Sequence, residues 1–383
     1  MSTGRDLFLI SNNGNSLSGV TTWMHQMARL FQSRGHRVHT IGMRKVNRKH
    51  PAVESADYPV TFLYESDPPL PWKPSTFRDR FDRAAQRREA ERIAERQRHC
   101  DTLSRLFSEA QPGGMVIVAQ VWAMHLVAEA DTAGLPVIGM NHNSFDYTRQ
   151  FGGRFRRIQH YFRDVERFLS LTREDADRWI GEGMDNAGAM PNALPFLPEE
   201  SSPREEKAVI SVGRLNEQKG LDLLLETWAR VAPHRPGWKL RIYGSGPDSK
   251  QLKRQCTALG LDDSVQWKGR THDVPGALRK GSVFVQSSRG EGFPLTLMEA
   301  MATGLPCAAF DCAPGVREIV RDGEDGLLAP PGEVETLADR LLALTGDQEL
   351  RDTMGERARV NVQRFSEREI AEEWERLFAL LEA

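Results

Sequence analysis

The feature that most constrains the fold is the alternation of short apolar, strand-like runs with helical stretches along nearly the whole chain. This pattern is typical of βαβ units, which form parallel sheets through right-handed crossovers. The predicted fold class is therefore α/β, with two doubly wound, Rossmann-like domains. The strand-like runs are residues 6–11, 36–43, 114–120, 135–142, 167–172, 208–214, 238–246, 264–269, 282–288 and 305–311.

A segment rich in Pro, Ser and Glu, residues 191–207, separates two series of these runs and has the composition of a linker. A chain of 383 residues suits two domains, at roughly 100–200 residues each. We predict an N-terminal domain over 1–195 and a C-terminal domain over 196–365. The amphipathic final helix, about 366–383, is expected to pack back on the N-terminal domain. Clefts between such domains are common ligand sites.

Charge is unevenly distributed between the two halves. Residues 1–195 carry 26 Lys and Arg against 22 Asp and Glu (26 − 22 = +4), and residues 196–383 carry 25 against 31 (25 − 31 = −6). The net charge of −2 argues against nucleic acid as a partner of the whole chain. The basic half is compatible with an anionic acceptor, with peripheral attachment to an anionic membrane, or with ordinary surface variation. The oligomeric state is not determined by these features.

The predicted location is cytoplasmic. The four cysteines form no C-x-x-C pair, the first residues lack the build of a signal peptide, and no run approaches the ~18 apolar residues of a membrane span. The Arg/Glu-rich stretch 76–110 predicts an exposed helix with intrahelical ion pairs, and contact with a membrane or an acceptor is left open. Residues 154–163, basic and aromatic, predict a helix that faces the cleft or solvent.

The strongest local signal is residues 289–306, which follow a strand-like run. Gly290 and Gly292 allow the backbone to approach a ligand, and Pro294 suits the first turn of a helix. The amides of Leu295 and Thr296 would then lie at a helix N-terminus, where a phosphate is favoured.

Two glutamates, Glu291 and Glu299, flank this phosphate site. Carboxylates accept hydrogen bonds, and the hydroxyls of a sugar or a ribose donate them. The two acids therefore indicate a sugar or a nucleoside beside the phosphate.

A second signal is residues 211–228, where a strand-like run ends in Gly213 and a helix begins near Gly220. Arg214 and Lys219 lie on the intervening loop. Two cations at the carboxyl end of a strand are able to bind a pyrophosphate and to stabilise charge on a leaving diphosphate.

Glu291 and Glu299 match the E-x7-E motif of retaining GT-B glycosyltransferases of family 4, which the chain resembles most strongly over residues 208–330. The resemblance implies that Glu291 contacts the donor sugar and that Glu299 holds the ribose hydroxyls. It also implies GT-B architecture with a central cleft, in which the N-terminal domain (1–195) binds the acceptor and the C-terminal domain (196–365) binds the nucleotide sugar. Three further groups match its donor-binding positions: Gly213, Arg214 and Lys219; Gly292 and Pro294; and Phe293, Leu295 and Thr296.

His142 follows a strand-like run in the N-terminal half, where the resemblance implies a histidine facing the donor sugar, with Asn143 beside it. Gly19, in a loop between the first strand and the first helix, corresponds to a glycine that closes over the donor diphosphate. The family often has two adjacent glycines here, and this chain has Ser18 before Gly19. The predicted catalytic residues are Glu291, His142, Arg214 and Lys219.

Two other segments match the family less closely. Residues 191–194 resemble a P-N-G element with Ala193 in place of the glycine, and Gly315 and Glu318 are expected to line or buttress the nucleotide pocket. Residues 242–250 contain a G-x-G but lack the third glycine of a dinucleotide fingerprint, since Ser249 stands at that offset, which predicts a simple turn.

The predicted activity is retaining transfer from a nucleotide sugar to a hydroxyl of a glycan, envelope polymer, lipid carrier or natural product. The habit of the family favours UDP. No D-x-D follows a strand, so no metal or other cofactor is expected. The alternatives are a sugar-nucleotide epimerase or phosphorylase of the same plan, a two-domain dehydrogenase, and a non-catalytic sugar-nucleotide-binding protein.

Overall fold

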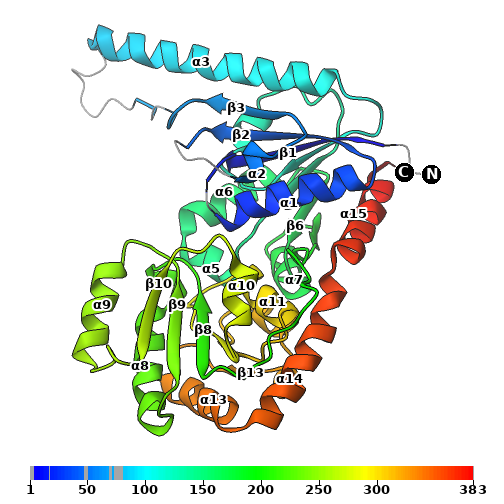
Figure 1. Ribbon diagram of the computed structural model, residues 1–383. Helices are drawn as coiled ribbons and strands as arrows, with labels where there is room; N and C mark the ends of the chain where they lie inside the picture. Colours follow the sequence, from blue (N-terminus) through cyan, green and yellow to red (C-terminus); the bar gives the residue numbers. More distant parts are fainter. Residues whose placement is uncertain (1–3, 17, 47–50, 69–70, 73–80, 383) are drawn as a thin grey trace.

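The N-terminal half forms one α/β layer system (Figure 1). The computed structural model describes residues 4–16, 18–46, 51–68, 71–72 and 81–382. The elements of this half are β1 (Asp6–Asn13), α1 (Gly19–Ser33), β2 (Arg37–Arg44), α2 (Pro51–Glu54), β3 (Val60–Tyr64), α3 (Arg83–Ser108), β4 (Met115–Val118), α4 (Met124–Val127), β5 (Val137–Met140), α5 (Phe145–Gln150), α6 (Gly152–Phe162), β6 (Arg167–Ser170), α7 (Arg173–Gly181) and β7 (Ala187–Ala189).

The C-terminal half repeats the plan. Its elements are β8 (Ala208–Val212), the 3-10 turn η2 (Glu217–Lys219), α8 (Leu221–Val231), η3 (Ala232–His234), β9 (Lys239–Tyr243), α9 (Ser249–Ala258), β10 (Val265–Gly269), α10 (Val274–Arg279), β11 (Val283–Gln286), α11 (Leu295–Ala302), β12 (Cys307–Phe310), α12 (Pro314–Ile319), β13 (Gly326–Ala329), α13 (Val334–Gly346), α14 (Gln348–Asn361), η4 (Val362–Phe365) and α15 (Glu367–Glu382).

Both sheets are parallel and share one strand order. The first runs β3-β2-β1-β4-β5-β6-β7 and the second β10-β9-β8-β11-β12-β13. In each sheet the order reverses beside the first strand, between β1 and β4 and between β8 and β11. Ligands of doubly wound sheets bind outside the carboxyl ends of the strands at such a switch point.

Buried side chains alternate between the two faces of each sheet, as parallel strands covered on both sides require. In β1, Leu7 and Leu9 belong to one apolar cluster and Phe8 and Ile10 to another. The first of these clusters continues without interruption into the C-terminal half, where it includes Met298 of α11. The two halves therefore share a core.

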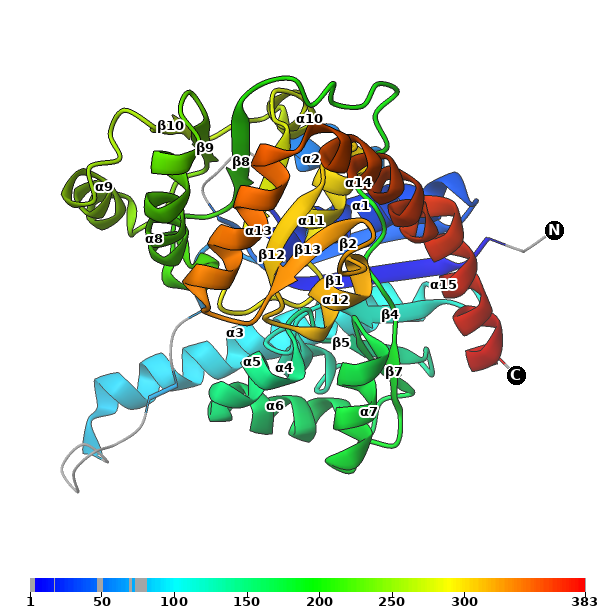
Figure 2. The same ribbon diagram turned by 90° about the horizontal axis from the view of Figure 1, so that it is seen from below.

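The last two helices connect the halves. Figures 1 and 2 show α14 beside the C-terminal sheet and α15 continuing onto the N-terminal half. On α15, the fully buried Trp374 has its ring centroid 5.6 Å from that of Phe31 and 6.5 Å from that of Trp23, both on α1. The final helix thus packs on the N-terminal half. The boundary between 195 and 196 stays a prediction.

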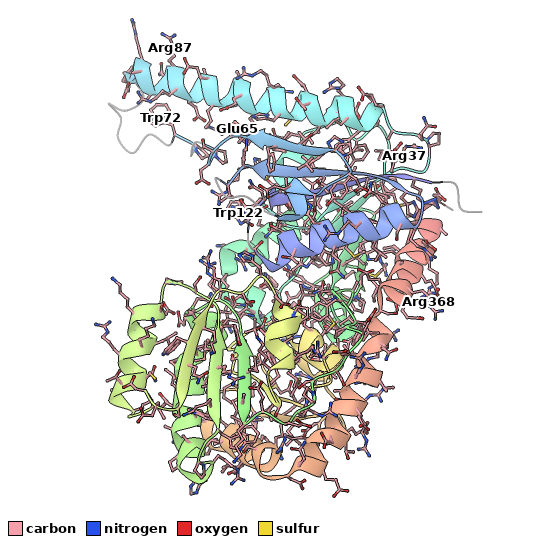
Figure 3. All side chains as sticks on the ribbon, viewed as in Figure 1. Arg37, Glu65, Trp72, Arg87, Trp122 and Arg368 are labelled. Atoms are coloured by element: carbon pink, nitrogen blue, oxygen red, sulfur yellow. The ribbon has the colours of Figure 1, made fainter. Side chains whose placement is uncertain are left out.

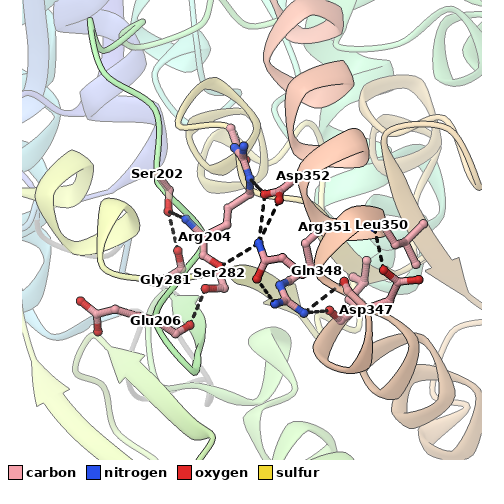
Figure 4. Close-up of polar contacts among 12 residues, drawn as sticks. Ser202, Arg204, Glu206, Gly281, Ser282, Asp347, Gln348, Leu350, Arg351 and Asp352 are labelled. Atoms are coloured by element: carbon pink, nitrogen blue, oxygen red, sulfur yellow. Dashed lines mark hydrogen bonds and ion pairs between the residues drawn. The ribbon is translucent and has the colours of Figure 1, made fainter.

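The segment between the sheets lacks helix and strand, but it is packed rather than loose. Asn192, Ala193 and Leu194 are buried. Further along, Arg204 Nε lies 2.8 Å from Asp352 Oδ1 on α14, and Ser202 Oγ donates to the Gly281 carbonyl at 2.6 Å (Figure 4). The linker composition therefore marks a fixed connection.

All ten strand-like runs overlap a strand of the structure, and the α/β class with two Rossmann-like sheets is confirmed. Three short strands were not predicted, namely β3, β7 and β13. The helix expected over 76–110 spans Arg83–Ser108, and residues 76–80 lie outside the described part of the chain. None of the helices in the described residues is long and apolar enough to cross a membrane.

Candidate active site

Loops from the carboxyl ends of the strands of both sheets meet between the two halves. The loops after β8 and β11 of the C-terminal sheet supply Gly213–Lys219 and Ser287–Pro294, and the loop after β5 of the N-terminal sheet supplies His142. Strands β8 and β11 are neighbours in the sheet, so their following loops lie side by side.

The centre of this arrangement is an ion pair between Lys219 and Glu291. Lys219 Nζ lies 2.6 Å from Glu291 Oε1, and the Ser288 hydroxyl donates to the same oxygen at 2.5 Å. Only 8% of the Glu291 side chain is exposed. A carboxylate this buried needs such partners, because an unpaired one would lose its hydration without compensation.

The loop that carries Lys219 is fixed against the β11 loop. Gly220 has φ +60°, and a Cβ there would lie 2.0 Å from the Ser287 carbonyl oxygen, so the approach requires glycine. Gln218 Nε2 donates to the Gly290 carbonyl at 2.9 Å, and Arg289 pairs with Asp222 of α8 at 2.6 Å. These contacts hold the two loops as one unit.

The G-x-G after β9, Gly244 to Gly246, packs closely against the loop that carries Lys219. A Cβ on Gly244 would lie 1.8 Å from the Gly213 carbonyl oxygen, and one on Gly246 would lie 2.1 Å from that of Leu215. The predicted βα turn is confirmed. Its glycines allow close packing against the 213–219 loop.

Helix α11 begins at Leu295 and ends at Ala302 before Thr303. Pro294, predicted in the first turn, is instead the N-cap, because its extended backbone (ψ 110°) precedes the helix. Leu295 and Thr296 are half-buried, so the first turn is reachable from outside. Phe293, just before the helix, is buried, and its carbonyl accepts from Asn192 Nδ2 at 3.0 Å. Amides at this position favour an anion.

Glu299 lies one turn into α11 and is half-buried. No other side chain in the described residues forms an ion pair or hydrogen bond with its carboxylate. Burial raises the pKa of Glu299 to about 7. A carboxylate without a partner in the described part of the chain is suited to accept hydrogen bonds from a ligand.

The two halves touch directly at the Glu291–Gly292 segment. The Ser144 amide donates to the Glu291 carbonyl at 3.1 Å. A Cβ on Gly292 would lie 2.1 Å from the His142 carbonyl oxygen, and one on Gly315 would lie 1.9 Å from the Gly292 carbonyl oxygen. Gly315 therefore buttresses the segment, as expected.

His142 is placed against α1. Its ring centroid lies 4.7 Å from that of Trp23, and its Nε2 is buried without a hydrogen-bond partner in the described residues. Burial lowers the pKa of His142 to about 4, so the imidazole is neutral near pH 7. A neutral ring with an unpaired nitrogen is able to donate to or accept from a hydroxyl.

For three predicted residues, the described part of the chain shows no contact that accounts for the predicted role. Arg214 is exposed, and no ion pair to it is found among the described side chains. Gly19 is exposed at the start of α1, and a Cβ there would meet no atom within 4 Å. Glu318 lines a cavity of about 570 Å³ with Arg173 and Arg364, a cavity whose lining does not include the ion pair.

Sequence reasoning missed three groups near the ion pair. Gln218 was hidden because its partner, Gly290, lies in another loop. Ser288 pairs with Glu291 within one loop, and the spacing of three residues was the signal that could have found it. The third group is Cys312, after β12. Burial, together with the nearby negative charge of Glu291, raises the pKa of its thiol to about 12. The thiol therefore stays protonated near neutral pH. In the part of the chain that the structure describes, no cluster of three or more His, Cys, Asp or Glu side chains is arranged to hold a metal ion.

Comparison with known proteins identifies the class. The model of the family "Glycosyl transferases group 1" matches residues 196–361. An uncharacterized glycosyltransferase of Haemophilus influenzae is 32% identical over 279 residues, covering 71% of this chain and 78% of that protein. The chain therefore belongs to the group 1 glycosyltransferases.

A second relative, an exopolysaccharide phosphotransferase of Streptomyces coelicolor, is 38% identical over 224 residues, covering 57% of this chain but only 24% of that protein. Among solved structures, HepE of Anabaena in complex with UDP superposes with a TM-score of 0.76 at 18% identity, covering 98% of this chain and 99% of that one. The architecture is GT-B.

Proposed function

We propose that the protein transfers a sugar, with retention at the anomeric carbon, from a UDP-sugar to a hydroxyl of a cell-envelope polymer, as a member of family 4. The observation that carries this proposal is the Lys219–Glu291 pair at the C-terminal switch point, next to the N-terminus of α11. The UDP complex of HepE supports the choice of nucleotide, and the exopolysaccharide relative supports the class of acceptor.

Cationic and amide groups would bind the diphosphate of the donor, and carboxylates would bind its hydroxyls. Arg214, Lys219 and the amides of Leu295 and Thr296 would bind the diphosphate and stabilise its charge as it leaves. Glu299 would accept hydrogen bonds from the ribose hydroxyls. Glu291 and His142 would contact the sugar, and closure of the two halves would exclude water.

We further propose that substitution occurs on one face of the sugar. Glu291 is engaged by Lys219 and Ser288, an arrangement that suits orientation better than nucleophilic attack. The bond from the anomeric carbon to the phosphate oxygen breaks while the bond to the acceptor oxygen forms. The acceptor proton passes to the departing phosphate oxygen.

Metal independence is part of the proposal, since Arg214, Lys219 and the helix N-terminus supply the positive potential. Transfer should continue unchanged after dialysis against EDTA. Activity that vanishes with EDTA and returns with Mg²⁺ or Mn²⁺ would reject this part.

The first test is calorimetric binding of UDP, GDP and ADP to the wild type and to Glu299→Ala. UDP should bind most tightly, and the substitution should cost roughly 1–3 kcal/mol if its hydrogen bonds are buried. The anomeric configuration of the product, measured by NMR, tests retention. Binding of UDP with no transfer, or with conversion of the sugar in the absence of an acceptor, would favour the binding protein or the epimerase instead.

A further inference from the structure

The N-terminal half contains a cavity of about 490 Å³ that none of the predicted site residues lines. Its walls are the ends of β1, β2 and β3 and the helices α3, α4 and α6. We call it the arginine pocket, after Arg44, Arg92, Arg96 and Arg157 in its lining. It opens at the carboxyl ends of the strands, the same edge of the sheet from which His142 approaches the other half.

Charge in the arginine pocket is predominantly positive. The lining holds four arginines against two acids, Asp67 and Glu129 (4 − 2 = +2). Arg96 lies 3.2 Å from Glu129, and Arg92 is held by Glu89 at 2.6 Å. Arg44 pairs with Asp67, whose side chain is 78% exposed. An ion pair to so exposed an acid contributes little, so Arg44 is available to another anion.

Among the arginines of the pocket, Arg157 is the one best placed to bind an anion. Its Cζ lies 3.4 Å from the ring centroid of Trp122, which is contact distance over the face of the indole. No carboxylate of the described residues pairs with it. A guanidinium held this way keeps its in-plane N–H donors free, in the fork that matches an oxyanion. Trp122 is 49% exposed, and Figure 3 shows it on the side of the N-terminal half that faces the C-terminal half.

Asn13, at the end of β1, lines the pocket and also contacts the first turns of α1. Arg44 Nε donates to Asn13 Oδ1 at 2.5 Å, and the Asn13 carbonyl accepts from Thr21 Oγ1 in the first turns of α1 at 3.0 Å. Gly19, at the start of that helix, is the residue proposed to lie near the donor diphosphate. A chain bound in the pocket would therefore extend toward the reacting centre.

We propose that the arginine pocket binds an anionic segment of the acceptor polymer, with an acid group on Arg157 and Arg44 and a sugar or polyol unit against Trp122. The proposal rests on the proposed function, because it names the acceptor of that reaction. The acid groups could be supplied by a phosphodiester backbone or by uronates, and both present oxyanions to the same donors.

The test measures binding in the absence of a donor, so that it does not depend on activity. A short glycerol-phosphate oligomer, a galacturonate oligomer and a neutral dextran oligomer are titrated into the full-length protein, and UDP is titrated separately. The variants are Arg157→Gln, Trp122→Ala and, as a matched control, Arg154→Gln. Arg154 lies on the same helix, over the ring of Phe151, and does not line the pocket.

At least one anionic oligomer should bind more tightly than dextran, with affinity that falls as salt rises. Arg157→Gln and Trp122→Ala should each weaken it about tenfold, while Arg154→Gln and the UDP affinity stay unchanged. Preference between the two anionic oligomers identifies the source of the acid groups. The proposal would be overturned if dextran bound as tightly as the anionic oligomers, or if neither anionic oligomer bound to a folded protein. It would also be overturned if Arg157→Gln and Arg154→Gln weakened oligomer binding equally. If the full-length wild-type protein bound an anionic oligomer but not UDP, the proposed function would be rejected instead.

Discussion

The Ser144 amide of the N-terminal half donates a 3.1 Å hydrogen bond to the Glu291 carbonyl of the C-terminal half. The residue whose carboxylate binds Lys219 is therefore also a point of contact between the halves. Placement of the carboxylate depends on both loops of the C-terminal sheet and on closure against the N-terminal sheet.

Replacing Lys219 by Met should leave the Glu291 carboxylate buried with the Ser288 hydroxyl alone. We expect the free energy of unfolding to fall by about 1–3 kcal/mol. The rate of sugar transfer, measured as UDP released from the UDP-sugar, should fall by about 100-fold. The double variant Lys219→Met/Glu291→Gln should regain stability but not activity, because no buried charge remains unpaired. Urea unfolding and an assay of released UDP measure the two effects.

Lys250→Met is the matched control, since Lys250 is an exposed lysine on α9. If Lys219→Met were as active as Lys250→Met, the ion pair would have no part in transfer.

Glu299 should make stability depend on pH. Its pKa in the folded chain is about 7, above the ordinary value of 4.5. The folded state therefore holds the proton more tightly, and stability should fall as pH rises from about 4.5 to 7. At about 1.4 kcal/mol per pH unit between about 4.5 and about 7, the loss of free energy of unfolding is at most about 3.5 kcal/mol. Glu299→Gln should remove this part of the pH dependence in urea unfolding, whereas a change at the exposed Glu356 should not.

Gly292→Ala should disturb the contact between the halves, because the new Cβ would lie 2.1 Å from the His142 carbonyl oxygen. We expect a loss of kcat/KM of at least about tenfold, since misplacement by about 1 Å is costly in catalysis. UDP affinity should change less, because the nucleotide is proposed to bind the C-terminal half. Gly181→Ala, where a Cβ meets no atom within 4 Å, is the control. Unchanged kcat/KM in Gly292→Ala would show that the closed contact is not needed.

Trp374→Ala should destabilise the fold by about 3–5 kcal/mol, the usual cost of truncating a fully buried aromatic side chain. The loss arises from contacts of α15 with Trp23 and Phe31 on the N-terminal half. Leu380→Ala on the same helix should have little effect, because Leu380 is 67% exposed. Thermal unfolding of both variants measures the difference. A similar Tm for both would mean that α15 contributes little to stability.

Local sequence patterns determined much of this protein. Apolar runs of strand length predicted the α/β class, and Pro294 placed the start of α11, because periodicity and fixed backbone angles act over a few residues. The E-x7-E spacing marked Glu291 and Glu299. Three strands were not predicted, and the clearest reason is at β7, whose residues Ala-Gly-Ala form no apolar run that would indicate a strand.

Tertiary structure decided which of these residues meet. Lys219 and Glu291 are 72 positions apart and pair only because β8 and β11 are neighbours in the sheet. Trp122 and Arg157 meet only because α6 packs beside the loop after β4. Strand order and helix packing depend on burial of the whole apolar surface, which is a sum over distant contacts. No local window of sequence contains that sum, so the sequence supplied the chemical groups and the fold supplied their distances.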